Sequence, residues 1–290
     1  MKFKNVFLSI VTMVLLSNFI FTPFYSSSIS VFDCRTSLQN MLETDTDNNT
    51  EYWGVVIEIT DTVYNIPSLY NSITSSKNWN SSRVIHIIGA NASKKAILES
   101  IEWMCNHSDS NDIVFFAVSS HGFSFRDSRG IVSWHNELIN IGELNEKFNR
   151  IEAQGICLLF DCCHSGEFVK KYPLKTHTLE AENRVVLMST WRNGLGTAGW
   201  IKNNNGTLTS VSLRNTVGEA IEKHIDYNND SICSVEEAFQ YAKQVIFPYA
   251  LETFFNVFFQ IIYLLKSSHL VIPFPTIYDN YEGELPLVMI

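Results

Sequence analysis

Two short segments of this chain carry side chains that together suit nucleophilic catalysis. His121-Gly122 follows an apolar run at residues 113–118, and Cys162-Cys163 follows a second apolar run at residues 156–160. A cysteine attacks as its thiolate, and a free thiol has a pKa near ~8.5, so a nearby imidazole must assist it. Neighbouring parallel strands would bring both segments to the edge of the sheet where ligands of open α/β sheets bind. The sequence therefore predicts a cysteine–histidine pair at that edge.

Attack on a carbonyl also requires donors for the oxygen that becomes negatively charged. The backbone N–H groups of Gly122 and Cys163 are the expected donors, because glycine lets the backbone approach closely. Successive residues on a strand face opposite ways, so only one of Cys162 and Cys163 can point at His121, and His164 is a poor base for Cys163. A single cysteine at a strand end is usually a small buried hydrophobe. The prediction therefore rests on the two segments occurring together.

The two segments resemble the paired motifs of a known peptidase superfamily. Ser-His-Gly at 120–122 and Asp-Cys-Cys-His-Ser-Gly at 161–166 look like the blocks of the caspase and metacaspase superfamily (clan CD, C14-type), where Asp-Ser-Cys-His-Ser-Gly is usual. The resemblance implies His121 as general base and acid, Cys163 as nucleophile, and Gly122 with Cys163 as the oxyanion hole. His121 and Cys163 lie 42 positions apart (121 to 163), which suits the family.

The resemblance covers most of the chain and implies its fold. It extends from about Trp53 to residues 278–286, which are similar to the ends of prokaryotic caspase-like proteins. We therefore expect a caspase-like three-layer α/β sandwich, with a mainly parallel sheet of about six strands flanked by helices.

Substrate preference is also implied only by resemblance. Asp161 matches the acid that lines the metacaspase site for P1, the residue whose carbonyl is attacked, and a carboxylate binds a Lys or Arg side chain well. Ser75 stands where metacaspase-like sequences carry a second acid of this substrate-binding site, so one of two expected carboxylates is missing. Residues 189–193 are superficially similar to the caspase segment that binds P1 Asp, which makes Arg192 the alternative specificity residue. A basic P1 is the expectation.

Residues 226–237 match the twelve-residue EF-hand calcium loop at its ligand positions. The predicted ligands are Asp226, Asn228, Asp230, Ile232, Ser234 and Glu237. Against this, Ser231 replaces the usual glycine at the sharp turn. The alternative interpretation is structural: Ser234 and Glu237 form a capping box that starts the next helix. Ca²⁺ is thus a candidate ligand, and the chemistry itself is expected to require no cofactor.

The elements that must position these residues follow from hydrophobic patterning. Runs rich in Val, Ile and Phe that do not alternate suit parallel strands buried on both faces, and helix-like stretches separate them. The predicted strands are 53–59, 84–88, 113–118, 156–160 and 185–188, and the predicted helices are 68–79, 93–105, 141–151, 210–224, 234–247 and 249–265. The last stretch carries Glu252, Asn256 and Gln260 on one helical face, which favours a helix packed on the sheet over a membrane span.

Composition restricts the function classes. The chain has 290 residues, is 46% hydrophobic and 18% charged, and carries a net charge of −9, so a disordered or nucleic-acid-binding protein is not expected. Six cysteines are too few for a disulfide-built scaffold. If the chain is exported, Cys34, Cys105, Cys157 and Cys233 are candidates for disulfides of undetermined pairing.

The N-terminus predicts export. Lys2 and Lys4 precede an apolar run at residues 6–21, a pattern typical of a secretory signal, or of an uncleaved membrane anchor. We expect a signal or anchor at 1–28, a polar linker at 29–50, and a peptidase domain at 51–290. The expected location is secreted or extracytoplasmic, with membrane contact only through an uncleaved N-terminus.

The leading hypothesis is an exported cysteine endopeptidase that acts on proteins or peptides. Lys170, Lys171 and Lys175 follow the nucleophile, so self-cleavage there is part of the hypothesis. One alternative is a catalytically inactive caspase-like binding protein, which Ser75 and the adjacent cysteines favour slightly. Another is a legumain-like asparaginyl peptidase or transpeptidase, although those relatives usually have Glu-Ala-Cys at the nucleophile.

Overall fold

The computed structural model describes residues 49–59, 68–125, 128–169, 177–191, 194, 199–202, 208–264 and 274–290. All of them belong to one compact unit, Glu43–Ile290. The predicted signal or anchor and nearly all of the predicted linker lie outside the described residues. Within the part of the chain that is described, no helix combines the length and the hydropathy needed to span a bilayer.

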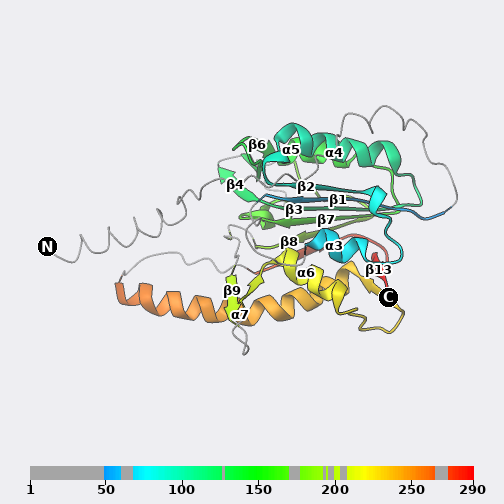
Figure 1. The fold of residues 1–290 in the computed structure, drawn as a ribbon. Helices are drawn as coiled ribbons and strands as arrows, with labels where there is room; N and C mark the ends of the chain where they lie inside the picture. The colour runs from blue at the N-terminus through cyan, green and yellow to red at the C-terminus, as the bar shows by residue number, and fades with distance from the viewer. Residues whose placement is uncertain are drawn as a thin grey trace. The chain divides into compact units, whose positions relative to one another are not determined.

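A six-stranded sheet forms the centre of the fold (Figure 1). Its order is β12-β8-β7-β3-β1-β2, and every neighbouring pair is parallel except β12 with β8. The strands are β1 (Tyr52–Glu58), β2 (Val84–Ile88), β3 (Ile113–Ser119), β7 (Gly155–Asp161), β8 (Arg184–Met188) and β12 (Thr276–Asp279). Every residue of β1, β3 and β7 is buried, which explains their continuous apolar runs. The predicted mainly parallel sheet is confirmed.

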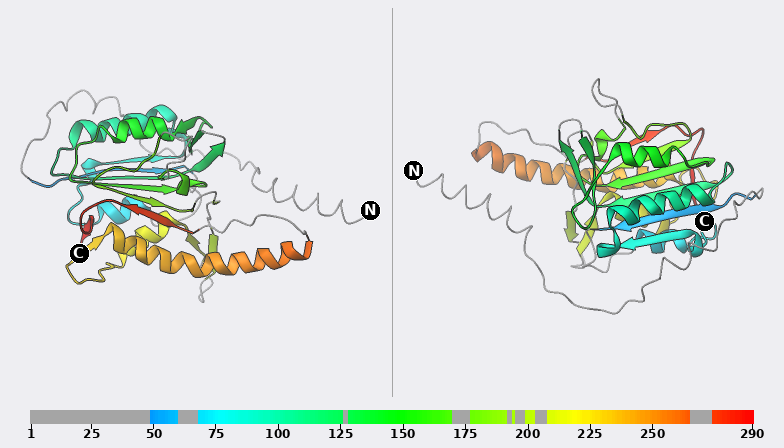
Figure 2. Two further views of the ribbon diagram at one scale, coloured as in Figure 1. Left: turned by 180° about the vertical axis from the view of Figure 1, so that it is seen from behind. Right: turned by 90° about the horizontal axis from the view of Figure 1, so that it is seen from above.

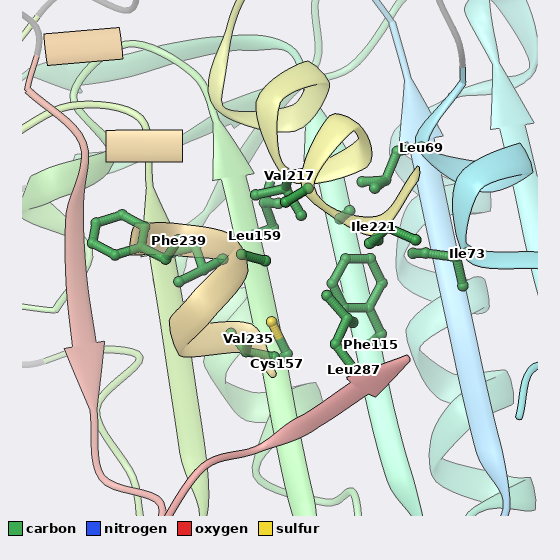
Figure 3. Close-up of a cluster of buried hydrophobic side chains, with 14 of the residues drawn as sticks. Leu69, Ile73, Phe115, Cys157, Leu159, Val217, Ile221, Val235, Phe239 and Leu287 are labelled. Carbon is green, nitrogen blue, oxygen red and sulfur yellow. The ribbon is translucent and has the colours of Figure 1, made fainter. Parts of the chain in front are cut away.

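Helices cover both faces of this sheet (Figures 1 and 2). One face carries α4 (Lys94–His107) and α5 (Ile141–Phe148). The other carries α3 (Leu69–Thr74), α6 (Leu213–Glu222) and the first half of α7 (Val235–Leu264). Each face has its own apolar core, and Figure 3 shows the core beneath α3, α6 and α7. The three-layer sandwich follows from these two cores.

Side chains define where the helices that border the site begin. The Ser93 hydroxyl accepts the Ala96 N–H and starts α4, and the Ser212 hydroxyl accepts the Asn215 N–H and starts α6. Residues 234–247 and 249–265, which we predicted as two helices, form the single helix α7 with Pro248 inside it. The predicted helix 68–79 is shorter, because α3 ends at Thr74.

Small accessory elements complete the described fold, and the sequence patterns did not predict them. The short strands form three sheets: β4 (His121–Phe125), β5 (Ser128–Val132) and β6 (Leu138–Asn140); β9 (Gly199–Lys202) and β10 (Leu208–Val211); and β11 (Ile232–Ser234) and β13 (Pro286–Met289). Short 3-10 turns are η2 (Ser81–Arg83), η3 (Gly89–Asn91) and η4 (Ser165–Glu167). β10 takes up the first residues of the predicted helix 210–224.

Candidate active site

The carboxyl ends of β3 and β7 are neighbours in the sheet. Ser119 pairs with Asp161 where the two parallel strands end. His121 and Cys163 each lie two residues further along, so the same register brings both residues to one edge of the sheet. At this edge β3 gives way to β4, which begins at His121.

The backbones of the two motif segments touch each other at Gly122. A Cβ atom on Gly122 would overlap the carbonyl oxygen of Cys163 and would lie 3.1 Å from the Sγ of Cys162. Only a residue without a Cβ fits this close approach. The predicted oxyanion-hole residues are therefore in contact, although they are distant in sequence.

The two adjacent thiols have different surroundings. Cys162 is 3% exposed and belongs to the core beneath α4 and α5. Burial, reinforced by the charge of Asp161, holds the pKa of the Cys162 thiol well above its usual value. Cys163 is half-buried, and His121 is exposed. Of the two thiols, Cys163 is the accessible one.

The segment after Cys163 is held by the loop that follows β8. His164 has a φ of 61°, which turns the chain sharply, and its N–H donates to the carbonyl of Gly194 at 2.7 Å. The hydroxyl of Ser165 accepts the N–H of Thr190 at 3.2 Å. Ser189 also donates its hydroxyl to the carbonyl of Cys162 at 3.1 Å. These contacts fix the backbone on both sides of Cys163.

Comparison with protein families identifies the chain. A family model described as the caspase domain matches residues 60–240, more than half of the sequence. The chain belongs to the caspase domain family. Proteins of this family are caspase-like cysteine peptidases, and protein or peptide substrates follow from that membership.

Solved structures and curated proteins were compared as well. Caspase-1 from Spodoptera frugiperda is 9% identical, with a TM-score of 0.48, and the match covers 87% of this chain and 95% of that one. A protein from Geobacter sulfurreducens is 10% identical, with a TM-score of 0.43, and the match covers 67% of this chain and 88% of that one. No curated protein matches.

In this caspase domain, Asp161 is joined to a residue that the sequence analysis missed. Asp161 is buried at the end of β7, and its Oδ2 accepts the backbone N–H of Arg214 in the first turn of α6 at 3.0 Å. Arg214 is itself only 4% exposed. The available signal was an arginine near the start of the predicted helix 210–224, but nothing in the pattern placed it beside Asp161. The role of Asp161 in substrate binding stays a prediction.

Ser75 is not brought to this edge of the caspase domain. It is exposed and caps the C-terminus of α3, where its hydroxyl donates to the Ser72 carbonyl at 2.8 Å. The following residue, Ser76, contacts the Met289 carbonyl of β13 instead. The opposite end of α3 approaches the site, because Ser68 donates its hydroxyl to Glu58 at the end of β1. The expectation that Ser75 lies in the substrate-binding site therefore needs correction.

The predicted calcium loop is organised by its own hydrogen bonds. Asp226 accepts the N–H groups of residues 229, 230 and 231, at 2.7, 3.1 and 3.0 Å. The Oε1 of Glu237 accepts the N–H groups of Tyr227 and Asn228 at 2.5 and 3.2 Å. Ser231, at the position of the usual glycine, has a φ of 68°. Within the described ranges, no group of three or more His, Cys, Asp or Glu side chains is suited to hold a metal ion.

The alternative interpretation of this loop is confirmed. Ser234 immediately precedes α7, and its hydroxyl accepts the Glu237 N–H at 3.1 Å. Glu237 Oε2 in turn accepts the Ser234 N–H at 3.1 Å. This reciprocal pair is the predicted capping box. The ligand set, including Asn228, Asp230 and the Ile232 carbonyl, remains a prediction.

Several predicted residues lie outside the described part of the caspase domain. They are Cys34, Lys170, Lys171, Lys175 and Arg192. Among the described cysteines, Cys105, Cys157, Cys162 and Cys233 are free thiols.

Proposed function

We propose that this caspase-domain protein is an active cysteine endopeptidase, with Cys163 as the nucleophile and His121 as the proton-transfer group. The contact between Gly122 and the Cys163 backbone carries the proposal, because it joins the two motif segments at the carboxyl edge of the sheet. The burial of Cys162 supports the choice of nucleophile, since only the neighbouring thiol is accessible.

The proposed reaction follows from these positions. The Cys163 thiolate attacks the scissile carbonyl carbon, a C–S bond forms, and the carbonyl π electrons move to oxygen. The backbone N–H groups of Gly122 and Cys163 stabilise that oxygen. When the oxygen reforms the carbonyl, the C–N bond breaks and the imidazolium of His121 gives its proton to the leaving amine. Water, deprotonated by His121, then hydrolyses the thioester and frees the thiol.

Covalent labelling tests the proposal. The purified full chain is treated with a panel of peptidyl acyloxymethyl ketones, and the labelled cysteine is located by mass spectrometry. We expect modification at Cys163, its loss in Cys163→Ala, and a rate at least about 100-fold lower in His121→Ala. Cys162→Ala is the matched control and should still be labelled, because it removes the buried thiol only.

Labelling of Cys162, or labelling of Cys163 that does not depend on His121, would contradict the proposal. The second outcome would favour a caspase-like binding protein without catalysis. Self-cleavage after Lys170, Lys171 or Lys175 is a separate hypothesis, because it requires a site that accepts a basic P1. It predicts fragments in the wild-type protein that are absent from Cys163→Ala on a blot.

Export is a separate proposal that rests on residues 1–28. A signal predicts recovery of the protein outside the cytoplasm, with a new N-terminus if the signal is cleaved. Fractionation followed by N-terminal sequencing distinguishes a cleaved signal from a retained anchor, and an intact chain found only in the cytoplasm would refute both.

A further inference from the structure

A buried row of charges crosses the sheet at the edge that carries Cys163. Glu58, Ser119 and Asp161 end three neighbouring strands in one register, so Glu58 and Asp161 lie two strands apart, about 10 Å. Arg214 of α6 spans this gap. Its backbone N–H donates to Asp161 at 3.0 Å, and its Nη1 lies 3.5 Å from Oε1 of Glu58.

This charged row lies on the same face of the sheet as the proposed nucleophile. Cys162 points into the core beneath α4 and α5, whereas Asp161 contacts α6 on the other face. Continuing the alternation of β7 two residues past its end at Asp161 directs Cys163 toward the face of Asp161 and α6. The P1 side chain branches one atom away from the carbonyl that Cys163 attacks. Among the described residues, the charges at the end of the strands on this face are therefore those of Asp161, Arg214 and Glu58.

The carboxylates of this row are already engaged. Glu58 accepts a hydroxyl from Ser68 at 3.1 Å and lies 3.0 Å from the Nε2 of His86. Burial alone raises the pKa of Glu58, but the hydrogen bond from His86 and the charge of Arg214 outweigh it, so the net pKa is lowered and Glu58 is anionic. The row thus holds a buried cation beside Glu58, on the residue whose backbone N–H binds the carboxylate that was expected to receive a basic P1.

A charged P1 side chain of either sign meets a like charge in this row. Lys or Arg would share Asp161 with the N–H of Arg214 and would stand near its guanidinium. Asp or Glu would face Asp161 and Glu58. Like charges at short distance inside a protein are costly, and an isolated buried charge costs more than a neutral group.

We infer that Arg214 makes this enzyme select an uncharged P1 side chain, in place of the basic P1 expected from Asp161 alone. The inference rests on the proposed peptidase function and names the substrate class of the same site. Arg214 is a specificity-determining residue in this account, and it takes no part in the bond-breaking steps.

Matched probes test the inference on the full-length protein. The acyloxymethyl ketones differ only at P1 and are compared in neutral and charged pairs of similar shape: citrulline with arginine, norleucine with lysine, and glutamine with glutamate. The readout is the second-order rate of Cys163 modification. We expect each neutral probe to react at least about 10-fold faster than its charged partner.

Two variants should each favour one sign of charge on the P1 side chain of the probe. Arg214→Met keeps an apolar stem but removes the cation, so the arginine probe should gain at least about 10-fold relative to citrulline. Glu58→Gln removes one anion, so the glutamate probe should gain relative to glutamine. Glu58→Gln also preserves a test if Arg214→Met does not fold. Arg150→Met, which replaces a half-exposed arginine paired with Glu102, should leave both ratios unchanged.

The outcomes separate the two proposals. Faster labelling of Cys163 by arginine or lysine probes than by their neutral partners overturns the inference and leaves the peptidase function intact. Ratios that do not change in either variant also overturn it. If no probe labels Cys163 in a His121-dependent manner, the proposed function fails, and the inference fails with it.

Discussion

Cys162 and Cys163 are adjacent in sequence but differ in burial, which governs the reactivity of a thiol. One thiol is sealed in an apolar core and is held in its protonated form by burial, while the other faces the edge of the sheet. The alternation of side chains along a strand predicted this separation from sequence. The neighbour of Asp161 was not predictable in the same way. Arg214 reaches Asp161 because α6 begins beside the end of β7, and this arrangement depends on the tertiary fold.

Gly122 provides the sharpest residue-scale prediction. In Gly122→Ala, the new Cβ would overlap the backbone carbonyl of Cys163, so the segment carrying the proposed nucleophile must move. A displacement of about 1 Å at a reacting group costs on the order of 100-fold in rate. We therefore expect the rate of Cys163 labelling to fall by about 100-fold or more.

Gly283→Ala is the matched control for this prediction. Gly283 has a φ of 87° but no atom within 4 Å of an added Cβ, so its replacement costs only backbone strain, about 1 kcal/mol. It should lower the melting temperature slightly and leave the labelling rate unchanged. Equal labelling rates in the two variants would show that the Gly122 contact does not position Cys163.

Among the helices and strands, the sequence predicted the long apolar strands of the central sheet. It did not predict the short strands that depend on pairing with other segments. The five predicted strands all occur, and β1, β3, β7 and β8 are buried along their whole length, whereas the edge strand β2 is only partly buried. The short strands β4, β5, β6, β11 and β13 lack such runs, and their residues become strands only through partners that are distant in sequence or joined by turns. The motif positions at the ends of β3 and β7 were predictable because they depend on the buried strands alone.

Residues 226–237 give an element-scale prediction. Glu237 is buried and accepts N–H groups with both carboxylate oxygens. In Glu237→Gln, the amide NH₂ would face N–H donors where one oxygen now lies, so at least one pair of these hydrogen bonds is lost. We expect the free energy of unfolding to fall by about 2–3 kcal/mol in the presence of a chelator, measured by urea denaturation.

The same measurement distinguishes a capping role from a calcium role. Glu219→Gln, which weakens a surface pair with Lys223, should cost less than about 0.5 kcal/mol and serves as the control. Repeating the denaturation with Ca²⁺ tests the predicted ligand set: binding would stabilise the wild type and not Glu237→Gln. A variant that is as stable as the wild type in chelator, and weaker only with Ca²⁺, would contradict the capping account.

At the scale of the whole domain, the C-terminal segment ties together elements from both ends of the described chain. β13 pairs with β11, and the Leu287 carbonyl accepts the indole N–H of Trp79 at 2.7 Å. The Leu285 N–H donates to Glu236, in the first turn of α7, at 2.9 Å. Ionisation of Glu236 is therefore expected to affect the contact between α7 and the C-terminal segment, and with it the stability of the whole domain.

Glu236 makes the stability of the domain depend on pH. Burial, with a smaller contribution from the charges of Asp279 and Glu284, raises its pKa to about 7, against an ordinary value of 4.5. The folded state therefore holds the proton more tightly than the unfolded state. The resulting stabilisation is complete below pH 4.5 and is lost as the pH rises toward 7. Glu236→Gln removes this titration and keeps an oxygen that accepts the Leu285 N–H.

We expect Glu236→Gln to become more stable than the wild type by about 1–2 kcal/mol as the pH is raised from 4.5 to 7.5, after allowance for partial screening by water. Urea denaturation at intervals of pH measures the difference, which should grow up to about pH 7 and then level off. Glu282→Gln removes a charge from the same segment at an exposed position, so its difference from the wild type should not follow this course. If the free energies of unfolding of the wild type and Glu236→Gln changed in parallel with pH, Glu236 would not bind a proton more tightly in the folded domain than in the unfolded chain. Any stabilisation of the domain at low pH would then come from other groups.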